Sequence, residues 1–70
     1  MLPHAIPIKR YPELRLAARH LPDNATVTPA EALALYEREA RSLDLQRMAP
    51  DEQALLNDLI RDVGHGVFNG

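Results

Sequence analysis

The sequence contains no cysteine or tryptophan, and its only aromatic residues are Tyr11, Tyr36 and Phe68. Without cysteine, no disulfide can stabilise the fold, and thiolate ligands for a structural metal are missing. A chain of 70 residues makes one domain, and a domain of this size buries only about 60% of its unfolded surface. We therefore expect a thin aliphatic core, and a dimer or a complex with a partner protein that supplies part of the burial.

Long apolar runs are also absent, and residues 1–7 contain no lysine or arginine. A membrane-spanning helix needs about 20 apolar residues, and a secretory signal begins with a basic region. Neither kind of segment is predicted. Because the lack of cysteine fits a reducing compartment, we predict a cytoplasmic protein that does not enter a membrane.

Positive charge is scarce, since the net charge is −2, whereas proteins that bind nucleic acids are usually basic. Residues 1–21 contain four basic residues and one acid, a balance of +3, and residues 22–70 contain four basic residues and nine acids, a balance of −5. We expect the basic segment to pair with the acidic helices of its own fold rather than with phosphate.

Prolines set the character of the first part of the chain. Pro3, Pro7 and Pro12 predict an extended leader over residues 1–12, suited to an edge strand, because proline fixes its own φ and restricts the preceding residue. Residues 12–21 predict a short helix that begins at Pro12, with a strand as the alternative because apolar residues alternate from Glu13 to Ala17.

Three helix-start signals lie close together after this segment. Thr28 is suited to cap a helix, Pro29 to the first helical position, and Glu31 completes a capping box. They predict a helix over residues 29–45. Its main apolar stripe consists of Ala32, Leu33, Tyr36, Ala40 and Leu43. Leu35 lies off the stripe, either as an isolated surface leucine or as part of a second apolar face that a partner covers.

A further helix is predicted over residues 50–63, because Pro50 is suited to its first position and an amphipathic pattern follows. Gly64 can adopt the left-handed backbone conformation that often ends a helix, so we predict that it stops this one. Residues 64–70 form a tail that contains the only phenylalanine. We predict that Phe68 packs on the core of the same chain or on a neighbouring subunit.

No motif for catalysis is found. Ser42 is the only serine, and neither His4 nor His20 lies beside a nucleophile in the sequence. The glycines around His65 lack the strand, helix and lysine of a phosphate loop. We therefore predict no enzyme activity, no catalytic residue and no cofactor.

One set of residues near the end of the last predicted helix has the composition of a metal site. Asp58, Asp62 and His65 have the spacing of one helical face, and carboxylates with an imidazole can bind metals. Gly64 separates the histidine from the helix, so we interpret the set as a solvated acidic face with a histidine near a helix C-terminus. No metal ligand is predicted.

Four segments carry a family resemblance: residues 11–15, 28–38, 48–52 and 64–69. Their order resembles small uncharacterised proteobacterial proteins that are similar to antitoxin-type partners encoded beside a larger toxin-like protein. The glycine-rich ending with its large apolar residue is the most distinctive of the four. The resemblance implies a role as a binding partner, and it transfers no catalytic residue.

Together, these patterns predict an all-α domain of three helices with an extended proline-containing leader. We expect a protein-interaction module that acts as an antitoxin-like or regulatory subunit, with Leu35, Tyr36 and Phe68 as apolar anchors and Arg38 at the rim. The alternative is a dimeric ribbon-helix-helix regulator that binds DNA, in which Arg15 would lie on a strand and face the major groove. The surplus of acids counts against this alternative.

Overall fold

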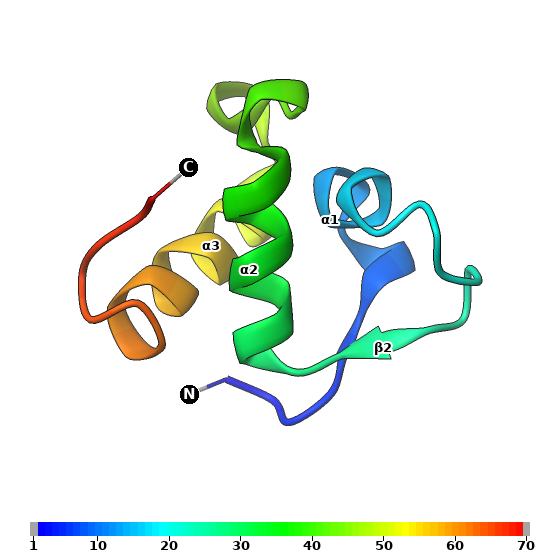
Figure 1. Ribbon diagram of the computed structural model, residues 1–70, viewed down its shortest axis with the longest axis horizontal. Coiled ribbons are helices and arrows are strands. Elements are labelled where there is room, and N and C mark those ends of the chain that lie inside the picture. The colour runs from blue at the N-terminus through cyan, green and yellow to red at the C-terminus, as the bar shows by residue number, and fades with distance from the viewer. Residues whose placement is uncertain (1, 70) are drawn as a thin grey trace.

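Helices make up most of the fold. A computed structural model describes residues 2–69 and contains, within them, α1 (Pro12–Ala17), α2 (Pro29–Glu39) and α3 (Pro50–Asp62). In Figure 1, α2 stands in the middle, with α1 on one side and α3 on the other, and it packs against both. The predicted small helical domain is confirmed.

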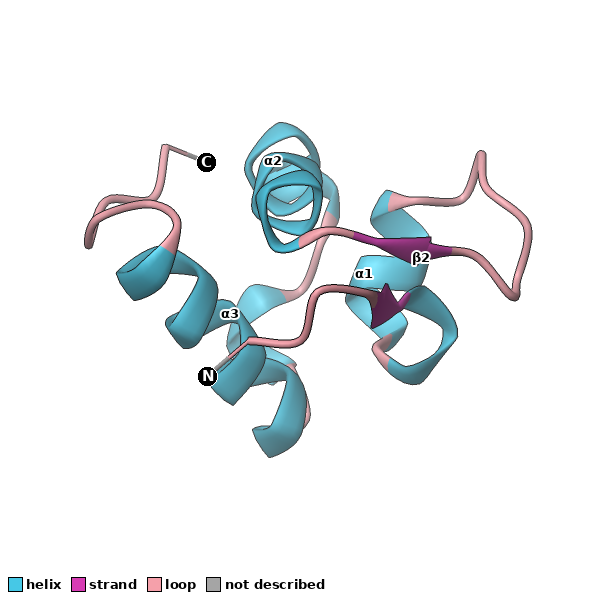
Figure 2. Cartoon of the chain, turned by 90° about the horizontal axis from the view of Figure 1, so that it is seen from below, coloured by secondary structure: helices cyan, strands magenta, loops and turns pink. Residues whose placement is uncertain are grey.

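Two short strands add a feature that the sequence indicated only in part. β1 (Ile6–Pro7) and β2 (Thr26–Val27) pair antiparallel, with Ile6 opposite Val27, and they lie side by side next to α1 (Figure 2). The prediction of an edge strand in the leader is confirmed, but β2 was not predicted. The leader is also not extended throughout, because Ile8–Arg10 forms a 3-10 turn that buries Ile8.

Each α-helix begins at a proline, as predicted. Pro12, Pro29 and Pro50 occupy the first turns, where the missing N–H leaves no hydrogen bond unmade. The capping box is confirmed: the Glu31 N–H donates to the Thr28 hydroxyl at 3.2 Å, and the Thr28 N–H donates to the Glu31 carboxylate at 2.9 Å. Local sequence therefore determines where the helices start.

Two helices end earlier than predicted. α1 stops at Ala17 instead of residue 21, because tight turns follow in which the Leu21 N–H bonds the Ala18 carbonyl at 2.9 Å. α2 stops at Glu39 instead of residue 45, and the chain continues through 3-10 turns at Ala40–Ser42 and Leu45–Arg47. Between these turns the Asp44 N–H donates to the Glu13 carboxylate at 2.7 Å. This contact with α1 redirects a segment whose apolar spacing alone favours a continuous helix.

The core contains one buried acid among the described residues, Glu52 of α3, which is 1% exposed. One carboxylate oxygen accepts the Tyr36 hydroxyl at 2.6 Å and the Leu14 N–H at 2.9 Å, and the other accepts the Glu13 N–H at 3.2 Å. Glu52 therefore caps α1 from a different helix and ties it to α2 and α3. Burial, together with the hydrogen bond to Glu52, raises the pKa of Tyr36 and keeps its hydroxyl protonated.

The end of α3 corrects the prediction for Gly64. The left-handed residues are His65, at φ 54°, and Gly66, at φ 86°. Gly64 is needed for another reason: a Cβ there would lie 2.6 Å from the Val67 carbonyl oxygen and 3.0 Å from that of Ile60. The close approach of the tail to the helix, rather than a positive φ, requires glycine at this position.

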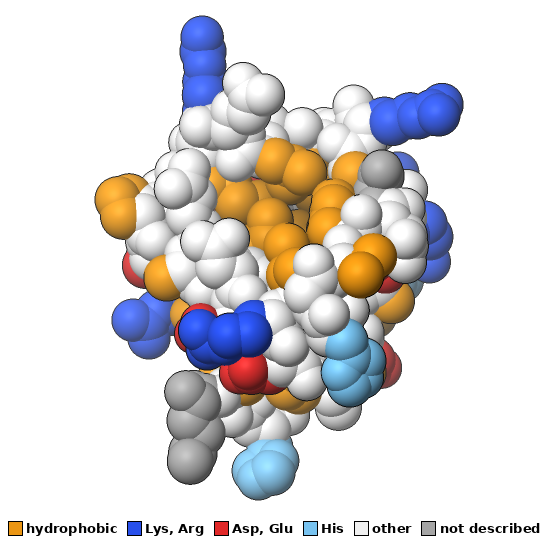
Figure 3. Space-filling view, turned by 90° about the vertical axis from the view of Figure 1, so that its left-hand side faces the viewer, with side chains coloured by type: hydrophobic (Ala, Val, Ile, Leu, Met, Phe, Trp, Pro, Cys, Tyr) orange, Lys and Arg blue, Asp and Glu red, His pale blue; other side chains and the backbone are white. Residues whose placement is uncertain are grey.

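The tail turns back toward α2 after this glycine. Phe68 is partly buried and packs against the core of its own chain, which is the first of the two predicted positions. The Asn69 N–H donates to the Glu37 carboxylate of α2 at 2.9 Å. Figure 3 views this side of the molecule, where apolar side chains gather around a hollow. Within residues 2–69, no helix is long and apolar enough to cross a membrane.

Candidate interaction groove

An open groove of about 290 Å³ lies between α2 and the segment that joins α1 to α2. Leu21, Val27 and Leu35 contribute apolar surface, and His20, Glu31 and Arg38 contribute polar surface. Ala34 also lines the groove, lies between Glu31 and Arg38 along α2, and is exposed. A volume of about 290 Å³ is at the small end of the range for ligand sites, which is about 300–1,000 Å³, and it has room for an inserted side chain.

The groove lies beside a second buried face of α2, which is separate from its main apolar stripe. Ala32, Leu33 and Tyr36 of the predicted stripe are buried, and Leu35 is also buried, at 8% exposure. Ala40 and Leu43 of that stripe lie beyond the end of α2 and are only partly buried. Val27 of β2 is buried with it and lines the same groove. Leu35 is thus neither an isolated surface leucine nor fully covered, because it borders an opening that the rest of the chain leaves unfilled.

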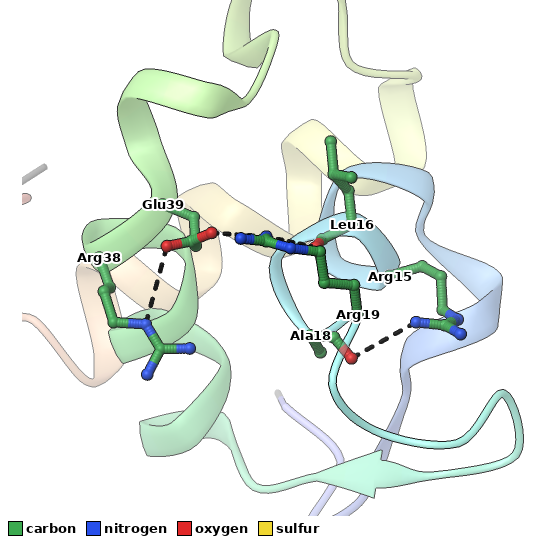
Figure 4. Close-up of polar contacts among 6 residues, drawn as sticks. All are labelled: Arg15, Leu16, Ala18, Arg19, Arg38 and Glu39. Carbon is green, nitrogen blue, oxygen red and sulfur yellow. Dashed lines mark hydrogen bonds and ion pairs between the residues drawn. The ribbon is translucent and has the colours of Figure 1, made fainter.

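Three charged side chains lie in a row beside the groove. Glu39 accepts a hydrogen bond from Arg19 Nη1 at 2.6 Å, and its other oxygen is 3.9 Å from Nε of Arg38 (Figure 4). The hydrogen bond from Arg19 lowers the pKa of Glu39, so this carboxylate is ionised at neutral pH. One negative charge between two positive ones leaves this end of the groove with a surplus of one positive charge.

The opposite end of the groove is acidic, but its carboxylate is engaged. Glu31 begins α2 and forms the capping box with Thr28, whose hydrogen bonds lower the pKa of Glu31. Glu31 and Arg38 are seven positions apart, which corresponds to about 10 Å along a helix. The groove therefore has an acidic end and a basic end, with Ala34 between them.

The four predicted partner-binding residues do not form one site. Leu35 and Arg38 line the groove, but Tyr36 is fully buried against Glu52 and offers no surface to a partner. Phe68 belongs to the tail, and Figure 1 places the tail and β2 on opposite sides of α2. His20, Leu21 and Val27 were missed as site residues because the packing of β2 beside α2 was not predicted from the sequence.

Two other candidates, the acidic set on α3 and Arg15, form local ion pairs. Asp58 and Asp62 each bond Arg61, at 2.8 and 3.0 Å. Throughout the described part of the chain, no group of three or more histidine, cysteine or acidic side chains is placed to hold a metal ion. Arg15 lies in α1, not on a strand, and its Nε donates to Asp23 at 2.9 Å.

No family model matches the sequence, and no curated protein or solved structure is significantly similar to it. The function is therefore argued from the groove and its charges.

Proposed function

We propose that this protein is a binding subunit that recognises another protein, and that the groove along α2 receives an apolar side chain of that partner. The observation that carries the proposal is the position of Leu35 and Arg38 at one opening, with an apolar floor and a charged rim. Protein interfaces commonly combine an apolar centre with a polar edge that selects the partner.

Protein is favoured over DNA as the partner. The net charge is −2, which opposes binding to phosphates. The ribbon-helix-helix alternative needs a strand around Arg15, whereas residues 13–17 lie in α1. Arg15, the residue suggested for base contacts, bonds Asp23. These contacts support the interaction module over its DNA-binding alternative.

The resemblance to antitoxin-type partners supplies a biological role for such a subunit. In this role, the protein regulates or neutralises a larger protein by covering part of its surface. Burial of apolar surface would provide the affinity, and charges at the rim would select the partner.

Native mass spectrometry of the tagged protein, purified from cells that encode it, tests the proposal. The decisive variant is Ala34→Arg, which places a long side chain at the groove without burying it, because Ala34 is exposed. Ala54→Arg is the matched control, since Ala54 is an exposed alanine inside α3. We expect one defined heteromeric mass for the wild type and for Ala54→Arg, and its loss for Ala34→Arg.

Two results would contradict the proposal. A heteromeric mass that survives in Ala34→Arg would place the partner elsewhere on the molecule. A monomer or a bare homodimer in all samples would show that the protein is not a subunit of such a complex.

A further inference from the structure

We infer that the partner segment in this groove is acidic, with an apolar side chain on the floor and a neighbouring aspartate or glutamate bound by Arg38. The inference rests on the proposed function and names the chemistry of the partner. It follows from the unequal way in which the charged groups at the two ends of the groove are used by the protein itself.

Arg38 is the group that remains available. Its side chain is 61% exposed, and its one ion pair within residues 2–69 is the long contact of Nε with Glu39 at 3.9 Å. Figure 4 shows the two terminal nitrogens of Arg38 pointing away from Glu39. A guanidinium presents paired N–H groups that match the two oxygens of a carboxylate. Arg38 can therefore bind an incoming carboxylate while it keeps its contact with Glu39.

The neighbouring groups favour an anion at this end of the groove. Glu39 is shared with Arg19, which approaches it at 2.6 Å, so it does not fully neutralise Arg38. His20, a second donor at the groove, is exposed. At the other end, Glu31 is held by Thr28. A partner segment should therefore place its carboxylate near the C-terminal end of α2, away from Glu31.

The apolar floor distinguishes a peptide from other sources of negative charge. Leu21, Val27 and Leu35 offer surface that an apolar side chain can cover, and a nucleic-acid phosphate has no group that would gain from it. Ala34 is small, so it leaves room for a side chain between the two charged ends of the groove. An acidic segment with an apolar anchor uses both features.

Selection from a library of random peptides tests the inference. The peptides are displayed with their C-termini fused, so a selected negative charge must come from aspartate or glutamate side chains. The full chain serves as bait, and Ala34→Arg and Ala54→Arg are used in parallel. We expect groove-dependent peptides, retained by Ala54→Arg and lost with Ala34→Arg, that combine a large apolar residue with an acid within a few positions.

Charge reversal at Arg38 then tests the contact directly. Arg41→Glu is the matched control, because Arg41 is an exposed arginine outside the groove. For a synthetic copy of a selected peptide, Arg38→Glu should weaken binding about tenfold or more, as expected for a lost charge-assisted hydrogen bond. Arg41→Glu should leave the affinity nearly unchanged, and circular dichroism should show that both variants are folded.

The outcomes separate this inference from the proposed function. Groove-dependent peptides without an acid preference, or equal effects of the two charge reversals, would overturn the inference and leave the proposed function standing. Failure to select any groove-dependent peptide would also overturn it, and the native mass measurement would decide the proposed function separately. A labelled DNA duplex that binds the wild type but not Arg38→Glu would show that the basic end receives phosphate instead.

Discussion

Two carboxylates connect the region of α1 to another helix, one inside the protein and one at its surface. Glu52 is 1% exposed and accepts three hydrogen bonds from two backbone amides and a hydroxyl. Glu39 accepts one from Arg19, a charged side chain that is 63% exposed. The buried acid is held by uncharged donors and the surface acid by a cation. We therefore expect burial, rather than formal charge pairing, to decide which of the two contacts contributes more to stability.

The physical reason is the fate of the partner groups when the acid is removed. Water can replace Glu39 as the partner of Arg19 and screens their attraction. Water does not reach the donors around Glu52 in the same way, and each buried donor left without an acceptor costs about 1–3 kcal/mol. The two sites should therefore respond very differently to the same type of substitution.

The largest effect is expected for Glu52→Ala. The substitution removes the acceptor for Tyr36, Leu14 and Glu13 at once, and we expect a loss of about 3–5 kcal/mol in the free energy of unfolding. Urea denaturation followed by circular dichroism measures it, with exposed Gln53→Ala as the control. Equal stability of the two variants would show that the buried junction is not special.

If Glu52→Ala does not fold, Glu52→Gln keeps one acceptor oxygen and allows the same comparison. We expect Glu52→Gln to be folded without urea and to unfold at a lower urea concentration than the wild type. A wild-type midpoint for Glu52→Gln would mean that the negative charge contributes nothing at this position.

A smaller effect is expected for Tyr36→Phe. The ring stays in the core, but the hydroxyl that donates to Glu52 at 2.6 Å is lost. Hydrogen bonds to charged groups contribute about 1.5–3 kcal/mol, so thermal and urea unfolding should show a loss near the lower end of this range. Tyr11→Phe is the control, because no hydrogen bond of the Tyr11 hydroxyl is found among residues 2–69. If the two variants have the same stability, the Tyr36 hydroxyl does not strengthen the junction.

The smallest effect is expected for Glu39→Gln, and it should depend on pH. Arg19 lowers the pKa of Glu39 below its ordinary value of 4.5 in the folded protein. The ion pair of Glu39 with Arg19 therefore contributes its full stability above about pH 4.5. This contribution is lost as the pH falls through the lower pKa that Glu39 has in the folded protein. The difference in melting temperature between wild type and variant should be small at pH 7 and vanish in acid. A difference that grows in acid would contradict this assignment.

Much of the fold follows from local sequence, because helix starts depend on neighbouring residues. Pro29, Thr28 and Glu31 determine the start of α2 within a few positions of one another. The amphipathic stripe of α3 and the docking of Phe68 were also predictable from residue type and spacing. The helix starts and the stripe of α3 need no knowledge of how distant segments meet, and for Phe68 the sequence left open which surface it packs on.

The groove and the junction depend on distant segments, and for this reason the sequence did not reveal them. Glu52 lies in the first turn of α3, where an acid is ordinary because it interacts well with the helix dipole. Nothing local indicates that the start of α1 will meet it. Leu35 is similar, since its burial depends on the unpredicted strand β2.

The junction at Glu52 also has a consequence for the order of events during synthesis. The Leu14 amide and the Glu52 carboxylate that accepts from it are 38 residues apart. On the ribosome, α1 emerges long before its cap exists, and contacts between such distant residues form slowly because the intervening chain must first close a loop. The cap of α1 can therefore form only after the chain through Glu52 has been made, and we expect α1 to gain its full stability together with α3.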